Sequence, residues 1–168
     1  MNKELKFTGI LSDEEFKKYP GCPSEERFKK GPVAVIECIQ EIPCNPCETA
    51  CPFGAIKVGE LITNLPILDE NKCKGCGLCI PYCPGLAIFT IDISYSQTEA
   101  VVSFPYEYLP LPKIGDKVRA VNREGKIVTT GRILKIKNPF KNDHTPVISV
   151  VIPKEWAMEV RSITIPQE

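Results

Sequence analysis

The feature that most constrains this chain is a run of four closely spaced cysteines over residues 73–84, with the spacing C-x2-C-x2-C-x3-C-P. Three thiolates within seven residues can wrap one compact inorganic cluster, because a tight loop directs each sulfur inward. The fourth thiol, on Cys83, follows a turn that Pro84 helps to set, so it points away from that cluster. It therefore suits a second cluster, whose other ligands must come from elsewhere in the chain.

A second cysteine run can supply those ligands. Residues 38–52 read C-x5-C-x2-C-x3-C-P, with Glu41 at the position where the usual first cysteine would fall. Cys38 must therefore reach the cluster across a loop that is longer by three residues. Both runs continue alike, as Cys-Pro-Phe-Gly-Ala-Ile at 51–56 and Cys-Pro-Gly-Leu-Ala-Ile at 83–88. This internal repeat predicts two copies of a cluster loop, a short turn or helix, and a strand.

Because of these two cysteine runs, residues 33–96 resemble bacterial-type ferredoxins with two [4Fe-4S] clusters. The resemblance implies a pseudo-twofold, ferredoxin-like domain and assigns the ligands to two sets. Cluster one would be bound by Cys38, Cys44, Cys47 and Cys83, and cluster two by Cys51, Cys73, Cys76 and Cys79. If Cys38 does not bind, cluster one could be a three-iron species or recruit another ligand.

Other uses of these cysteines fit less well. Structural zinc sites usually take two cysteines from each of two knuckles, whereas here three or four lie together and a proline follows. Disulfides are disfavoured by this crowding and by the lack of a signal peptide. The ninth cysteine, Cys22, is expected to be an unused thiol that binds neither cluster. The alternative is that it competes with the other cysteines as a ligand of cluster one. The single histidine, His144, is expected to be solvated in a polar loop.

The composition excludes some classes of function. Lys and Arg total 21, as do Asp and Glu, so the formal charge is zero and gives no sign of nucleic-acid binding. No apolar run approaches the roughly 18 residues of a membrane span. The N-terminus has neither an apolar signal segment nor a twin arginine, so a cytoplasmic location is expected.

The chain is expected to be an α+β protein in four parts. Residues 1–31 form a polar extension with short helices, one of which starts at a capping box on Ser12 and another at Ser24. Residues 32–104 form the ferredoxin domain, with an added return strand at 100–104. Residues 105–112 form a Pro-rich linker. Residues 113–168 form a small all-β, barrel-like module, with a hairpin turn at Gly125 and a bulge or bend at Gly131.

These expectations point to electron transfer rather than to catalysis by this chain alone. We find no dinucleotide fingerprint, no phosphate loop and no Ser/His/Asp arrangement, and therefore expect no flavin or nucleotide on this chain and no catalytic residues. The whole layout, including residues 118–125, also resembles the iron–sulfur subunits of flavin-dependent amino-acid or amine dehydrogenases of the proline, hydroxyproline or sarcosine type. That resemblance implies flavoprotein partner subunits. A free soluble ferredoxin, and a structural iron–sulfur module that binds a protein, are the alternatives.

The two clusters are expected to differ in reduction potential. Near cluster two, Gly75 and Gly77 leave backbone N–H groups free to approach sulfur, and Lys72 and Lys74 are cations. Near cluster one, Pro46 removes an N–H group, and the anions are Glu37, Glu41 and Glu48. Hydrogen bonds and positive charge stabilise the more negative reduced state, so cluster two is predicted to be reduced first, chiefly through the backbone donors.

Overall fold

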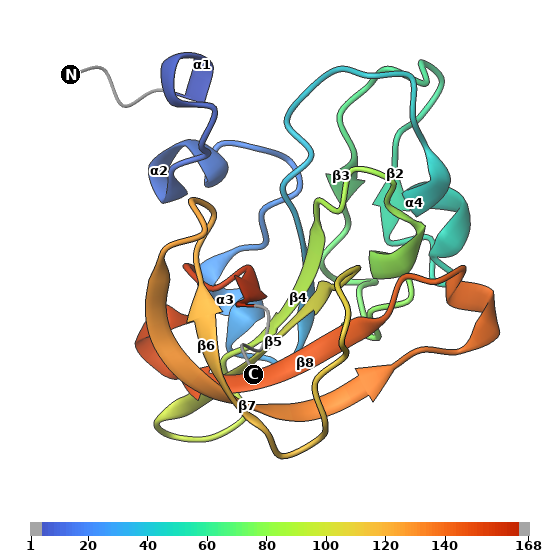
Figure 1. The fold of residues 1–168 in the computed structure, drawn as a ribbon. Helices are drawn as coiled ribbons and strands as arrows, with labels where there is room; N and C mark the ends of the chain where they lie inside the picture. Colours follow the sequence, from blue (N-terminus) through green and yellow to red (C-terminus); the bar gives the residue numbers. More distant parts are fainter. Residues whose placement is uncertain (1–4, 165–168) are drawn as a thin grey trace.

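The computed structural model of the protein describes residues 5–164 (Figure 1). Residues 1–4 and 165–168, the outer ends of the predicted extension and of the predicted C-terminal module, lie outside the described part. Short helices and strands alternate in the first half of the chain, and strands dominate the second half. None of the described helices is long and apolar enough to cross a membrane.

The helices are α1 (Leu5–Thr8), α2 (Asp13–Phe16), α3 (Glu25–Phe28) and α4 (Pro46–Ala50), with 3-10 turns η1 (Ile80–Tyr82), η2 (Phe140–Asn142) and η3 (Lys154–Trp156). The strands are β1 (Val33–Ile36), β2 (Ile56–Lys57), β3 (Ile67–Leu68), β4 (Ile88–Asp92), β5 (Glu99–Pro105), β6 (Lys117–Val121), β7 (Ile127–Lys137), β8 (Val147–Pro153) and β9 (Ser162–Ile163).

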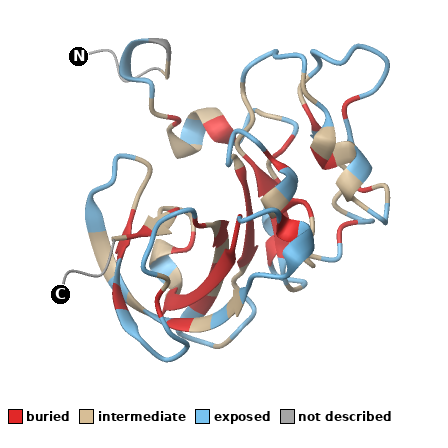
Figure 2. Cartoon of the chain, turned by 45° about the vertical axis from the view of Figure 1, so that its right-hand side comes forward, coloured by how far each residue is buried: buried red, intermediate tan, exposed pale blue. Residues whose placement is uncertain are grey.

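Seven strands form one antiparallel sheet in the order β1-β4-β5-β8-β7-β6-β9, and β2 pairs with β3 in a separate small sheet. The predicted return strand is confirmed, because β5 lies antiparallel to β4 with Val102 opposite Ile91. The other edge of β5 pairs with β8 over seven residues. All residues of β8 except the last are buried, so this strand forms the centre of the core (Figure 2).

The prediction of a barrel-like module at residues 113–168 is wrong, because the sheet does not close on itself. β9 pairs only with β6 at one end of the sheet, and β1 pairs only with β4 at the other end. Closure of a separate barrel would need both edges of β8, and β5 occupies one of them. The strands after residue 113 therefore extend the sheet that β1 and β4 begin. The predicted domain boundaries stay a prediction.

The bulge predicted at Gly131 lies elsewhere in β7. The register with β8 shifts between Ile133 and Lys135 and that with β6 shifts between Ala120 and Val121, so neither irregularity is at Gly131 itself. A Cβ atom on Gly131 would lie 2.5 Å from Val150 Cγ1, which is closer than real Cβ contacts. Glycine is needed here so that β8 can approach. The turn predicted at Gly125 is confirmed, since this residue has a φ of 74° and joins β6 to β7.

The N-terminal extension packs onto the strand that leads to Cys38. The capping box predicted at Ser12 is present at the start of α2, and Ser24 caps α3 as expected. Gly21 lies against β1, because its carbonyl oxygen accepts a 3.0 Å hydrogen bond from the N–H of Ile36. Phe16 is buried in the same core as the sheet. The extension is thus tied to β1 by both backbone and side-chain contacts.

Candidate metal centres

The two cysteine runs fold into similar local structures, as the internal repeat predicts. Helix α4 ends at Cys51 with φ −87° and ψ 103°, and turn η1 ends at Cys83 with φ −85° and ψ 108°. Four residues later, the N–H of Ala55 donates to Cys51 Sγ at 3.3 Å and that of Ala87 donates to Cys83 Sγ at 3.4 Å. The two cysteines predicted to cross between the clusters are therefore held in the same way.

The first set of thiols comes from both cysteine runs. Burial, together with the charges of Cys83, Cys38 and Cys44, raises the pKa of the Cys47 thiol to about 11. Burial also raises the pKa of Cys38, with contributions from Cys83 and Cys44. Cys38 thus lies in electrostatic range of the other members in spite of its longer loop. These are the four cysteines predicted for cluster one.

The second set forms in the same way around Cys79. Burial, together with the charges of Cys73, Cys76 and Cys51, raises the pKa of this thiol to about 12. The same four cysteines line one cavity together with apolar side chains such as Ala34 and Ile56. These are the four cysteines predicted for cluster two. That each thiol binds iron stays a prediction.

The donor chemistry fits iron–sulfur clusters. Thiolate sulfur is a soft ligand that suits iron in a sulfide cage, and backbone N–H groups near the sulfurs favour the thiolate form. The four thiols of the second set line one cavity together. Within residues 5–164, no three His, Cys, Asp or Glu side chains form a group that could hold a metal ion.

Cys22 lies apart from both sets. Burial raises the pKa of its thiol, and the charges that affect it are Lys17, Glu37, Asp13 and Arg161 rather than other cysteines. Its S–H donates to the carbonyl oxygen of Pro23 at 3.5 Å. This environment agrees with the expectation of an unused thiol. His144 is exposed in the loop before β8, as expected.

Gly75 fixes the loop between the first two cysteines of the second run. It has a φ of 61°, and a Cβ atom there would lie 2.3 Å from the carbonyl oxygen of Pro32. The loop can pack this closely against the chain before β1 only because residue 75 lacks a side chain.

A Gly75→Ala substitution is therefore expected to destabilise the folded protein by about 2 kcal/mol or more, through backbone strain and overpacking. It should also reduce the iron retained by cluster two, since the loop that carries Cys73 and Cys76 must move. Gly85→Ala is the matched control, because a Cβ atom at Gly85 meets nothing within 4 Å. Denaturant unfolding and iron analysis of both variants measure the effect. Equal losses in the two variants would contradict this explanation.

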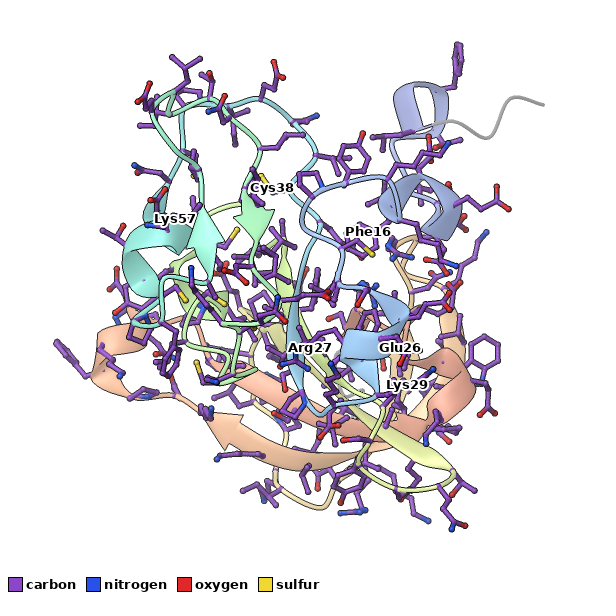
Figure 3. All side chains as sticks on the ribbon, turned by 180° about the vertical axis from the view of Figure 1, so that it is seen from behind. Phe16, Glu26, Arg27, Lys29, Cys38 and Lys57 are labelled. Atoms are coloured by element: carbon purple, nitrogen blue, oxygen red, sulfur yellow. The ribbon has the colours of Figure 1, made fainter. Side chains whose placement is uncertain are left out.

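A side chain from the N-terminal extension holds the same loop. Arg27 on α3 (labelled in Figure 3) donates to the carbonyl oxygens of Cys73 at 2.8 Å and Pro32 at 2.9 Å. It also donates to those of Gly31 and Glu70, each at 3.0 Å. Sequence reasoning missed Arg27, and no local pattern reveals it, because the contacts join residues up to 46 positions apart.

A buried ion network lies beside the first set of thiols. Glu37 precedes Cys38 and binds Arg123 at 2.7 Å and Arg161 at 2.8 Å, while Arg123 also binds Asp13 at 3.0 Å. Burial alone would raise the pKa of Glu37, but the hydrogen bonds and charges of the two arginines bring it below its usual value. Arg161 also lies over the Phe89 ring, 5.1 Å from its centroid. The network joins the extension, β1 and the C-terminal strands.

Comparisons with known proteins agree with the site. Residues 66–89 match the family model of the 4Fe-4S binding domain. A component of the ion-translocating oxidoreductase complex from Methanosarcina acetivorans is 45% identical over 47 residues, which are 28% of this chain and 17% of that protein. The polyferredoxin-like subunit of an aliphatic sulfonate oxidoreductase from Pyrococcus furiosus is 44% identical over 48 residues, which are 29% of this chain and 27% of that protein.

An uncharacterised ferredoxin from Methanocaldococcus jannaschii is 41% identical over 44 residues, which are 26% of this chain and 27% of that protein. No solved structure matches this chain. The matched stretches span well under a third of the length of these relatives. The chain therefore carries a 4Fe-4S ferredoxin-type domain that is homologous to polyferredoxin-like and related subunits of oxidoreductase complexes.

Proposed function

We propose that this chain is an electron-transfer subunit that carries two [4Fe-4S] clusters. The observation that carries the proposal is that Cys51 lines one cavity with Cys73, Cys76 and Cys79 of the other run; the charge of Cys83 on the Cys47 thiol supports the reciprocal arrangement. Because Cys51 and Cys83 cross between the sets, the clusters would lie close together and act as a relay. When bound, each cluster would accept and release one electron without making or breaking a covalent bond.

The residues of this chain would hold and insulate the clusters rather than act on a substrate. Ala34, Ala55 and Ala87 direct backbone N–H groups at the sulfurs of Cys73, Cys51 and Cys83. The second set lies against the buried Ala34 and Ile56, which exclude water from one side of the thiols. A low-polarity, hydrogen-bonded setting of this kind is one of the means by which proteins adjust cluster potential.

The partner is proposed to be a larger oxidoreductase. The relatives from Methanosarcina acetivorans and Pyrococcus furiosus are subunits of such complexes, and the five strands after β4 add surface without adding chemistry. The narrower proposal is a relay in a flavin-dependent amino-acid or amine dehydrogenase, where flavoprotein subunits would oxidise the substrate and pass electrons to this chain. It is supported by the resemblance of the chain's layout, including residues 118–125, which contain the Arg123 that anchors Glu37.

The test of electron transfer is cluster reconstitution under anaerobic conditions, followed by a reductive titration. The expected result is about eight irons per chain, and two one-electron steps that reverse on reoxidation. Clusters that form but never change oxidation state would support the structural alternative and contradict the proposal.

The test of the complex is anaerobic purification of the native protein, with identification of co-eluting chains and a flavin assay. Flavoprotein chains in fixed ratio, and cluster reduction when the substrate of those chains is added, are expected. A protein that elutes alone with its iron would instead favour a free ferredoxin carrier.

A further inference from the structure

We propose that Arg27 and Lys137 raise the reduction potential of cluster two above that of cluster one, so that cluster two takes the first electron. This inference rests on the proposed function, and it assigns a role to two side chains that lie outside both cysteine runs. One comes from the N-terminal extension and the other from the C-terminal end of β7. Neither belongs to the part of the chain that matches the 4Fe-4S binding domain.

Arg27 brings a positive charge to the backbone of cluster two. Its guanidinium donates four hydrogen bonds to carbonyl oxygens, one of which belongs to Cys73 at 2.8 Å. The guanidinium is partly buried, so water screens its charge less than that of a surface cation. Its carbonyl partners are neutral and leave the charge in place.

Lys137 brings a second charge to the same loop. Its Nζ donates to the carbonyl oxygen of Cys76 at 3.0 Å. Lys137 is the last residue of β7, so the extension of the sheet beyond β5 is what carries this ammonium group to the cluster loop. It also lines a groove with Gly75, Cys76 and Gly77. Both cations therefore contact ligand residues of the second set.

The lysines that the sequence suggested contribute in different ways. Lys72 pairs with Asp69 at 2.9 Å, which cancels most of its charge, whereas Lys74 lines the cavity of the second set and adds to the positive charge of Arg27 and Lys137. Two nearby anions oppose these cations: the Glu70 carboxylate, which accepts hydrogen bonds from Ser24, and Asp92, which lines the same groove as Lys137. With Arg27 and Lys137 included, the surroundings of cluster two remain net positive.

Cluster one has no comparable excess of positive charge among the residues described. The charge of Glu37 is matched within the network of Arg123, Arg161 and Asp13, which is neutral overall. Glu48 pairs with Lys57 at 3.3 Å and accepts a hydrogen bond from the Val58 N–H. Both are thus compensated.

Backbone donors do not separate the two clusters. In the first set, N–H groups of Ala87, Gln40 and Glu48 lie against Cys83, Cys38 and Cys47. In the second set, those of Ala34 and Ala55 lie against Cys73 and Cys51, and the N–H of Cys79 lies against its own thiol. The expectation that backbone donors dominate the asymmetry therefore gains no support from these contacts, and the cations account for it instead.

The reason for the effect is electrostatic. A reduced cluster carries one more negative charge than an oxidised one, and a nearby cation stabilises the reduced form more. Removing one such charge should change the reduction equilibrium of cluster two about three- to tenfold, given partial screening by water. For a one-electron couple, a tenfold change corresponds to 59 mV.

The test is an EPR-monitored redox titration of the reconstituted protein and of Lys137→Met, Arg27→Gln and Arg27→Lys. Lys137→Met and Arg27→Gln should each lower the midpoint of the higher-potential cluster and leave the other nearly unchanged. Arg27→Lys keeps the charge and should restore most of the shift. Lys126→Met is the matched control, because Lys126 is an exposed lysine beside the opposite end of β7.

The outcomes separate this inference from the proposed function. Iron analysis first establishes that both clusters are present; if they do not form in the wild-type protein, the proposed function fails. If both form but Lys137→Met and Arg27→Gln leave the higher midpoint potential unmoved, or move only the lower one, this inference is wrong.

A Cys38→Ser variant, in which only cluster one should change, identifies which redox signal belongs to which cluster. A shift of the higher-potential signal in that variant would also overturn the inference. Should Arg27→Gln fail to fold, the exposed Lys137 still provides the test.

Discussion

A Cys79→Ala protein is expected to hold about four irons per chain in place of about eight after reconstitution. The Cys79 thiol is buried and lines one cavity with those of Cys51, Cys73 and Cys76, so its removal takes one predicted ligand from the second set. The remaining cluster should still be reducible, since its four predicted ligands are unchanged. Iron and sulfide analysis, with the EPR spectrum of the reduced protein, measures both effects.

Cys22→Ala is the matched control for this loss. Its thiol is partly buried but stands apart from both sets, so the variant should keep all of the iron. Loss of iron in Cys22→Ala, or full iron content in Cys79→Ala, would contradict the ligand sets. Cys38→Ala provides a third comparison, because failure of that residue to bind would leave the iron content unchanged.

A Glu37→Gln substitution is expected to destabilise the folded protein by about 3–5 kcal/mol, the usual cost of breaking a buried ion pair from one side. The side chains of Glu37, Arg123 and Arg161 are 10%, 12% and 5% exposed. Glutamine keeps the size of the side chain but removes the charge that compensates Arg161. That guanidinium would then be buried without an anion. Urea unfolding of the cluster-loaded protein measures the change.

Glu26→Gln is the control for loss of an ion pair. Glu26 pairs with Lys29 at 2.6 Å on α3, but both side chains are exposed (Figure 3). Water replaces such a contact readily, so the unfolding midpoint should barely move. A similar change in both variants would show that the buried network contributes no more than a surface pair.

The local chemistry was readable from the sequence because it is set over short distances. The spacing within residues 73–84 and 38–52 predicted the two loops, and the repeated tails predicted the similar geometry at Cys51 and Cys83. Capping residues such as Ser12 and Ser24 also predicted helix starts correctly. Each of these features involves residues only a few positions apart.

The C-terminal half shows where this reasoning stops. Strands β6, β7 and β8 were expected from their apolar, β-branched residues and the turn at Gly125, and they are present. Their arrangement was predicted wrongly, because a strand's sequence does not reveal which neighbour takes each edge. The seven-residue pairing of β8 with β5 joins these strands to the ferredoxin sheet and leaves no closed barrel.

The sequence by itself determined which residues are the candidate cluster ligands and how each cysteine loop is shaped, since residue spacing and backbone conformation are local properties. Only the tertiary structure decided which charges surround those loops. Arg27 reaches Cys73 from 46 positions away, Lys137 reaches Cys76 from 61 and Arg161 reaches Glu37 from 124. Electrostatic interactions depend on distance in space rather than along the chain, so only the folded chain brings these groups together.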